Sequence, residues 1–201
     1  ICGGGSVMFE KPHNITLEKL IEVNKALLHS GADIFEMNTI RKHLSVVKGG
    51  GLVKLLFPAK VVSLIFSDVP GNDLSVIASG TTVLDKTTIQ DAWSVYNKYE
   101  LGKLELTEND FIETPKDENI FSTSENILML SNKTALEAMQ QKAKELKISC
   151  EIYSEKFQSE AELAGKSLID KTEDNSILLV GGETTVKVAN KDGVGGRNQE
   201  V

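Results

Sequence analysis

The apolar residues of this chain change repeatedly between a helical and an extended spacing. From residue 17 to residue 28 they recur every three or four positions, as on one face of a helix. Thr16 stands where a helix N-cap belongs, and Gly31 follows the run, where helices commonly end. The pattern predicts a helix between these two residues.

A second helical pattern begins directly afterwards. Asp33 is a capping residue, and Glu36 stands three positions on, at the spacing of a capping box. We expect this helix to continue to the glycines at 49–51 and a short helical turn to follow it. The apolar face of the expected helix comprises Met37, Ile40, Leu44 and Val47.

The run "VVSLIF" at residues 61–66 is almost wholly apolar and rich in β-branched residues. Strands of a parallel sheet have this composition because helices cover both faces of such a sheet. We therefore expect a central parallel strand that is covered on both faces.

The second half alternates strands and helices after a charged, proline-containing segment at 107–121, which indicates a domain boundary. A helix is expected before it, at 88–99. Beyond it, three strands and two helices make a βαβαβ unit, so the fold class is α/β, with domains at 1–116 and 117–201. The expected elements beyond the boundary are strands at 126–130, 149–154 and 176–180, helices at 133–146 and 160–171, and a hairpin turning near 190–193.

Composition narrows the class of protein. The 201 residues carry 22 basic and 29 acidic side chains, a net charge of −7, without a long basic run, so we expect neither nucleic acid nor a membrane as partner. The longest apolar run is far shorter than a membrane span, and no signal segment is evident, which predicts a cytoplasmic protein. Cys2 and Cys150 have no metal-ligand spacing with the histidines, and we expect both to be small buried hydrophobic residues.

Two loops contain residues suited to anions or metals. Gly3-Gly4-Gly5-Ser6 fits close approach to a phosphate or carboxylate, or only a tight turn, and it matches neither the dinucleotide fingerprint nor the Walker A loop. Asp68 follows the expected strand at 61–66, where ligands gather in open α/β sheets. It suits a Mg²⁺ ligand or a catalytic base, or else the cap of a turn.

Two further regions contain charged residues beside glycines. On the second helix, Asn38, Arg41, Ser45 and Lys48 form a polar stripe that borders the core or is simply solvated, and the following glycines could supply N–H groups to an anion. Near the C-terminal end, "GGETT" (181–185) offers Glu183 to a metal, and "GGRNQE" (195–200) offers Arg197 to phosphate oxygens. Together these loops indicate phosphoryl transfer.

The motifs, taken in order, resemble a known family. The strings are "GGGS", "SGADIFEMNTIRKHLSVVKGG", "SDVPGND", "IASGTTVLD", "ETP", "GGETTVKV" and "GGRNQE". They are similar to the glycerate 2-kinase family that carries a C-terminal MOFRL domain, some members of which are called hydroxypyruvate reductase. The resemblance implies a Rossmann-like parallel-sheet domain followed by a smaller α/β domain of MOFRL type. It also implies ATP- and Mg²⁺-dependent transfer of phosphate to the 2-hydroxyl of D-glycerate.

The resemblance also assigns roles to residues. Asp68 corresponds to an acidic active-site residue and Arg197 to a phosphate-stabilising arginine, and Asp68 and Glu183 are the candidate Mg²⁺ ligands. The candidate substrate residues are Gly4, Gly5, Ser6, Asn38, Arg41 and Lys42. The candidate nucleotide residues are Lys48, Gly49, Gly50, Gly182, Glu183, Thr184 and Asn198.

The chain departs from the family pattern at several places. Gly51 stands where an arginine is common, Asn72 replaces an aspartate, and Thr81 replaces a proline. Family members are about twice as long, with an upstream lysine in a Gly-Lys-Ala setting and a downstream Thr-Asp-Gly segment. We therefore expect an internal fragment whose first sheet lacks strands.

Two alternatives to a kinase remain open. A hydroxypyruvate reductase would use a nicotinamide cofactor, although the chain lacks the spaced-glycine fingerprint. A remnant that binds glycerate or nucleotide without turnover is the other. In each case we expect small-molecule partners, and the sequence leaves the oligomeric state open.

Overall fold

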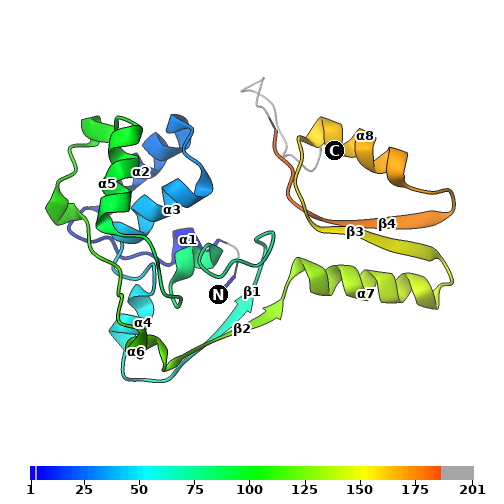
Figure 1. The fold of residues 1–201 in the computed structure, drawn as a ribbon, viewed down its shortest axis with the longest axis horizontal. Coiled ribbons are helices and arrows are strands. Elements are labelled where there is room, and N and C mark those ends of the chain that lie inside the picture. The colour runs from blue at the N-terminus through cyan, green and yellow to red at the C-terminus, as the bar shows by residue number, and fades with distance from the viewer. Residues whose placement is uncertain (3, 187–201) are drawn as a thin grey trace. The chain divides into compact units, whose positions relative to one another are not determined.

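A computed structural model describes residues 1–2 and 4–186, and the chain divides into two compact units (Figure 1). The first unit comprises residues 1–66 and 73–129, and the second comprises residues 67–72 and the chain from 130 onward. The predicted domain boundary, between 116 and 117, lies earlier than this division. The division falls later because the strand around residues 124–130 pairs with the strand at 61–66.

The first unit is mainly helical. It contains α1 (Gly5–Met8), α2 (Leu17–Ser30), α3 (Ile34–His43), α4 (Gly51–Leu56), α5 (Ile89–Lys98) and α6 (Glu118–Phe121), with 3₁₀ turns at Ile77–Gly80, Leu101–Leu104 and Glu108–Asp110. The prediction for α2 is confirmed: the Thr16 hydroxyl oxygen accepts from the Lys19 N–H at 3.1 Å, and Gly31 ends the helix in the left-handed region. The core of this unit contains Leu20, Val23, Leu27, Ile40, Leu44, Ala92, Tyr96, Leu101, Leu106 and Phe111.

The predicted capping box of α3 is also confirmed. The Asp33 carboxylate accepts from the Glu36 N–H at 2.9 Å, and the Glu36 carboxylate accepts from the Asp33 N–H at 3.1 Å. Glu36 also accepts from the Lys98 ammonium and, at 2.6 Å, from the Tyr99 hydroxyl. The bond from Lys98, then that from Tyr99, lowers the pKa of Glu36 to about 2. One carboxylate therefore caps α3 and joins it to the end of α5.

The prediction that α3 extends to the glycines at 49–51 is wrong. The helix ends at His43, because the next residues pair with an earlier segment of the chain. The Leu44 carbonyl accepts from the His13 N–H, and the Val46 N–H donates to the Lys11 carbonyl, both at 2.8 Å. The short helical turn expected after this segment is α4.

The strand β1 (Val61–Phe66) has hydrogen-bonded neighbours at both edges. On one side lies β2 (Ser124–Leu130), which runs parallel: the Val61 N–H donates to the Thr123 carbonyl and the Ser67 N–H to the Leu130 carbonyl. On the other side, Ile1 donates to the Leu64 carbonyl at 2.8 Å and accepts from the Phe66 N–H at 2.9 Å.

The prediction that β1 is covered on both faces is wrong for the described part of the chain. Ser63 and Ile65 are buried, whereas Val62, Leu64 and Phe66 are 44–49% exposed. The described residues pack against one face only, so the opposite face carries apolar side chains without cover.

The second unit has the predicted order of helices and strands. It contains α7 (Asn132–Glu145), β3 (Ser149–Phe157), α8 (Ala161–Lys171) and β4 (Ser176–Gly182), and in the view of Figure 1 the two strands lie between the two helices. β3 and β4 pair in parallel, with Ser149 opposite Ser176. The three strands of the predicted βαβαβ unit do not form one sheet, because β2 pairs with β1. The predicted hairpin near 190–193 lies outside the described residues.

Both cysteines are free, and neither is fully buried, so that prediction is corrected. Cys2 is exposed because it precedes the surface turn that begins α1, and Cys150 is half-buried near the start of β3. Within residues 1–2 and 4–186, no helix has the length and hydrophobicity of a membrane span.

Two adjacent residues of α2 test the position of the core. Leu27 is fully buried and Leu28 is 65% exposed. We expect Leu27→Ala to lower the free energy of unfolding by about 2–5 kcal/mol, because it leaves a cavity. Leu28→Ala is the matched control and should change it by less than about 0.5 kcal/mol. Urea denaturation of both variants measures the difference, and equal losses would contradict this core.

Candidate functional site

The first unit contains a cavity of about 430 Å³ beside α3. Its wall is built from α3 and from two loop segments, residues 73–76 and 83–87. Eight polar or charged side chains line it: Asn38, Thr39, Lys42, Asp73, Ser75, Asp85, Lys86 and Thr87. Acidic, basic and amide groups therefore meet around one concave surface, as in many small-molecule sites.

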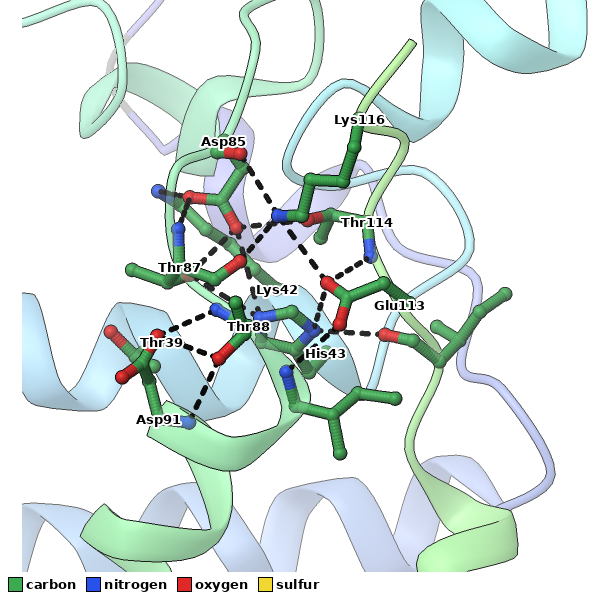
Figure 2. A network of polar contacts seen from close by, with 12 residues as sticks. Thr39, Lys42, His43, Asp85, Thr87, Thr88, Asp91, Glu113, Thr114 and Lys116 are labelled. Atoms are coloured by element: carbon green, nitrogen blue, oxygen red, sulfur yellow. Dashed lines mark hydrogen bonds and ion pairs between the residues drawn. The ribbon is translucent and has the colours of Figure 1, made fainter.

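A buried ion pair forms part of this wall. Lys42 is 6% exposed and Asp85 is 3% exposed, and the Lys42 Nζ donates to Asp85 Oδ1 at 3.0 Å (Figure 2). Asp85 Oδ2 accepts from the hydroxyls of Thr87 at 2.7 Å and Thr114 at 3.2 Å. Burial raises the pKa of Asp85, but the hydrogen bond from Thr87 and the charge of Lys42 together outweigh burial, so the pKa is lowered. Asp85 is thus held as a carboxylate.

Further polar groups surround this pair. The Lys116 ammonium donates to the Asp85 carbonyl at 2.9 Å and to the Thr114 hydroxyl at 2.6 Å. His43 is fully buried, with Nδ1 2.9 Å from the Ile112 carbonyl and Nε2 3.8 Å from Asp85 Oδ2. We call Lys42, Asp85, Thr87, Thr114 and Lys116 the Asp85 cluster. It joins α3 to two segments that are distant in sequence (Figure 2).

The glycine-rich turn at 49–50 packs against a strained loop. The N–H groups of Gly49 and Gly50 donate to the carbonyls of Ser79 at 3.0 Å and Gly80 at 2.8 Å. Ala78 and Ser79 are buried in the left-handed region, which costs roughly 1–2 kcal/mol for each such residue. These two glycine amides are therefore paired within the protein.

The same turn lies close to the Asp85 cluster. A Cβ on Gly49 would lie 2.7 Å from Thr114 Cγ2 and 3.3 Å from Asp85 Cβ, and Gly49 has a φ of +55°. Only glycine fits this position without displacing the cluster. Close packing against the Asp85 cluster therefore explains why residue 49 is a glycine, whether or not an anion binds at this turn.

The predicted substrate residues are partly brought together. Asn38 and Lys42 line the cavity, whereas the Arg41 Nε donates to Asn24 Oδ1 at 2.6 Å and Arg41 does not line it. Burial lowers the pKa of Arg41, and the charge of Glu10 opposes that shift. The predicted polar stripe of four residues on one helix is corrected, since its last two members lie beyond the end of α3.

Other predicted residues of the first unit lie elsewhere. The side chain of Lys48 is 3% exposed, and its ammonium forms an ion pair with Glu10. Gly4 and Gly5 begin α1, and the Ser6 hydroxyl lies 3.3 Å from that of Ser79. The turn at residues 4–6 therefore contacts the strained loop, and it does not line the cavity.

Asp68 belongs to the second unit and is exposed. The loop that follows it, with Gly71 and Asn72, lines a second cavity of about 420 Å³ together with Lys133 and Lys156. Asp68 is not itself a lining residue of this cavity. Glu155 also lines this cavity, and its carboxylate lies 3.5 Å from the Lys133 ammonium, so the pocket carries charges of both signs.

The remaining predicted residues follow β4. A Cβ on Gly182 would lie 1.9 Å from the Phe157 carbonyl oxygen, so Gly182 allows close approach to β3. The Glu183 N–H donates to the same carbonyl at 2.9 Å, and Thr184 Oγ1 is buried without a hydrogen-bond partner among the described residues. Arg197 and Asn198 lie outside the described residues.

Neither Asp68 nor Glu183 belongs to a metal-binding cluster in the described part of the chain. There, no group of three or more His, Cys, Asp or Glu side chains could hold a metal ion. Mg²⁺ is commonly held by one or two carboxylates together with substrate phosphates. A single protein carboxylate is therefore compatible with such a site, and both residues stay predictions.

The Asp85 cluster is the part of the site that sequence reasoning missed. Asp85 and Thr114 stand at the end of the string "IASGTTVLD" and inside "ETP", but neither has a chemical motif of its own. The one available signal was Lys42, because a lysine on a helix face that borders the core needs a buried acidic partner. No residue pattern near Lys42 identifies which acidic residue is its partner.

Comparison with known proteins agrees with this fold. A family model described as a domain of unknown function, DUF4147, matches residues 1–110. The whole chain is 40% identical to a D-glycerate 2-kinase of Thermotoga maritima and 40% identical to a putative hydroxypyruvate reductase of Agrobacterium vitis. It covers 50% and 49% of those proteins, so it spans about half the length of the curated relatives it matches.

A solved structure is similar over the same extent. The crystal structure of a glycerate kinase from Thermotoga maritima superposes on the whole chain with a TM-score of 0.87 at 39% identity, and the chain covers 50% of it. The α/β fold class and the resemblance to glycerate 2-kinases, both expected from the sequence, are thereby confirmed.

The pKa of Asp85 predicts how stability depends on pH. Because this pKa is lower in the folded than in the unfolded protein, the carboxylate adds stability above its ordinary pKa of 3.8. That stability is lost as the pH falls through the folded pKa. We expect Asp85→Asn to cost about 3 kcal/mol at pH 7, because it leaves Lys42 unpaired, and to cost progressively less below pH 3.8.

Urea denaturation across this pH range measures the effect. The control is Glu22→Gln, which removes an exposed carboxylate paired with Lys19 and should change the free energy of unfolding by less than about 1 kcal/mol. A loss in Asp85→Asn that stays constant down to the acid limit would show that the charge of Asp85 is not responsible.

Proposed function

We propose, on the premise that the chain belongs to the DUF4147 family, that the protein transfers a phosphoryl group from ATP to D-glycerate. The products are 2-phosphoglycerate and ADP. The observation that carries the proposal is the 40% identity of the whole chain to a protein named D-glycerate 2-kinase, with a TM-score of 0.87 to a glycerate kinase structure. Since the chain spans about half of those relatives, the activity is proposed for the protein that contains it.

The chemistry requires one bond to form and one to break. The C2 hydroxyl oxygen of glycerate attacks the γ-phosphorus of ATP, the bond to the ADP oxygen breaks, and the hydroxyl proton passes to a base. We assign the base to Asp68, which is exposed and follows a strand. We assign to Arg197 the neutralisation of charge on the transferring phosphoryl group, because its planar guanidinium matches phosphate oxygens.

The binding residues proposed from the sequence have unequal support. Asn38 and Lys42 are supported as substrate residues by their place in the wall of the cavity, while Arg41, Gly4, Gly5 and Ser6 do not line it. Among the nucleotide residues, Thr184 has an unpartnered hydroxyl, and Gly182, Glu183 and Asn198 stay proposals. Lys48, Gly49 and Gly50 are less well supported, because their polar groups pair within the protein.

We further propose that the reaction uses Mg²⁺ and takes place in the cytoplasm, where ATP is available. When bound with ATP, the ion neutralises charge on the phosphates. Asp68 and Glu183 would hold it through carboxylate oxygens.

A second candidate is supported by one observation. A relative from Agrobacterium vitis is named a putative hydroxypyruvate reductase. That activity requires a nicotinamide site, and the chain lacks the spaced-glycine fingerprint that commonly binds such cofactors. The kinase is therefore better supported than the reductase. Binding of glycerate or nucleotide without turnover is the third candidate function.

An assay of ADP release distinguishes these candidates. We expect ADP to form only when ATP and D-glycerate are both present, and Asp68→Asn to lower kcat by a factor of about 10²–10⁴. The control is Asp170→Asn, an exposed residue of α8 outside both cavities, which should retain full activity. Oxidation of NADH by hydroxypyruvate without ADP formation would support the reductase, and saturable binding without either reaction would support the third candidate.

A further inference from the structure

His43 is fully buried and has a polar group beside each of its ring nitrogens (Figure 2). Its Nδ1 lies 2.9 Å from the Ile112 carbonyl oxygen, and its Nε2 lies 3.3 Å from the Thr87 hydroxyl oxygen. The Ile112 N–H also donates to the His43 carbonyl at 2.7 Å, so two contacts join these residues. The ring is therefore fixed from both sides.

The hydrogen atoms available to these contacts decide how many protons the ring carries. A carbonyl oxygen only accepts, so the contact with Ile112 requires a proton on Nδ1. The Thr87 hydroxyl has one proton, which it donates to Asp85 Oδ2 at 2.7 Å. The Thr87 oxygen then accepts from the ring, which requires a proton on Nε2 as well. A histidine with a proton on each nitrogen is an imidazolium cation.

The charges around the ring favour this cation. Asp85 Oδ2 lies 3.8 Å from Nε2, and Glu113 Oε1 lies 3.8 Å from Nδ1. Asp91, in the first turn of α5, is a third carboxylate that interacts with the ring. Lys42 on α3 and Lys116 supply two positive charges to the same network. Three carboxylates and two lysines leave one negative charge, which an imidazolium balances.

A proton on Nε2 determines how Asp85 is held. Because Nε2 donates to the Thr87 oxygen, the Thr87 proton is directed to Asp85 Oδ2. Asp85 Oδ1 then accepts from the Lys42 ammonium at 3.0 Å. A neutral ring with a bare Nε2 would compete with Asp85 for the hydroxyl proton. The charge on the ring therefore affects Lys42 through two intervening side chains.

We propose that His43 is an imidazolium in the folded protein and is a positioning residue for Lys42. It acts through the Thr87 hydroxyl and the Asp85 carboxylate, and it does not itself line the cavity of the first unit. The charge of the ring rests on the hydrogen-bond geometry. Its effect on the reaction rests on the proposed function, in which Lys42 is a substrate residue.

Nitrogen NMR of the labelled protein at pH 7 tests the charge. The two nitrogens of an imidazolium have similar chemical shifts, whereas in a neutral ring the bare nitrogen resonates far from the protonated one. The chain has three histidines, so His13→Gln and His29→Gln identify the other two sets of signals. We expect the imidazolium pattern for His43. Widely separated nitrogen signals for this residue would overturn the proposal.

A pair of variants at Thr87 tests the route to Asp85 by the same spectrum. Thr87→Ser keeps a hydroxyl, so the His43 signals should keep the imidazolium pattern. Thr87→Val has nearly the same shape but no acceptor for Nε2, so the signals should move toward those of a neutral ring. An unchanged pattern in Thr87→Val would overturn the route through this hydroxyl.

Kinetics of the protein that contains this chain test the positioning role. His43→Gln should raise the KM for D-glycerate about 10-fold and change kcat by less than about 2-fold. A residue with only a structural role would lower the amount of folded enzyme, and so kcat, without changing KM. The control is His29→Gln, an exposed residue of α2, which should change neither. An unchanged KM in His43→Gln would overturn the positioning role.

These measurements separate the inference from the kinase reaction. An imidazolium at His43 that depends on the Thr87 hydroxyl, without ADP formation, supports the charge of the ring while the proposed function fails. ADP formation by a protein in which His43 is neutral leaves the proposed function intact and overturns the inference.

Discussion

The structure of the first unit depends on the pairing of two buried charges, Lys42 and Asp85. Moving an isolated charge from water into the protein interior costs several kcal/mol even after relaxation, so each charge requires the other. The two residues are 43 positions apart in the chain. Their pairing fixes where α3 meets the segment after residue 83, and Thr114 and Lys116 bring a third segment to the same point. The pairing of Lys42 with Asp85 thereby also positions two of the segments that form the cavity wall.

The parts of the fold that sequence could predict are those with local causes. The capping box of α3, with Asp33 as cap, depends on side chains three residues apart, and the helix begins where the pattern placed it. The end of α3 depends on pairing with residues 11–13, some thirty positions earlier, and the helical spacing of apolar residues gave no hint of it. The exposure of one face of β1 likewise depends on which other segments pack against that strand.

The residues of the candidate site also divide into those that local sequence features predict and those that they do not. Asn38 could be named from its spacing on one helix and from a resemblance to a family, and Lys42 from that resemblance alone. Asp85, Thr114 and Lys116 contribute through contacts between distant segments, so their residue types alone carried no signal. Gly49 shows how a motif is misjudged: a glycine-rich turn is typical of anion loops, yet here its amide is bonded to Ser79 and its missing side chain admits the Asp85 cluster.

This crowding at Gly49 has a consequence for how the protein can evolve. Any single substitution there adds atoms 2.7 Å from Thr114, and the neighbouring Asp85 and its lysine would shift with it. A change of ligand preference that began at this turn would therefore need compensating changes on distant segments at the same time. Substitutions on the exposed side of the cavity wall, such as at Lys86, meet no such barrier. Single mutations on this exposed side of the wall can therefore change ligand specificity more readily than mutations of the glycine-rich turn.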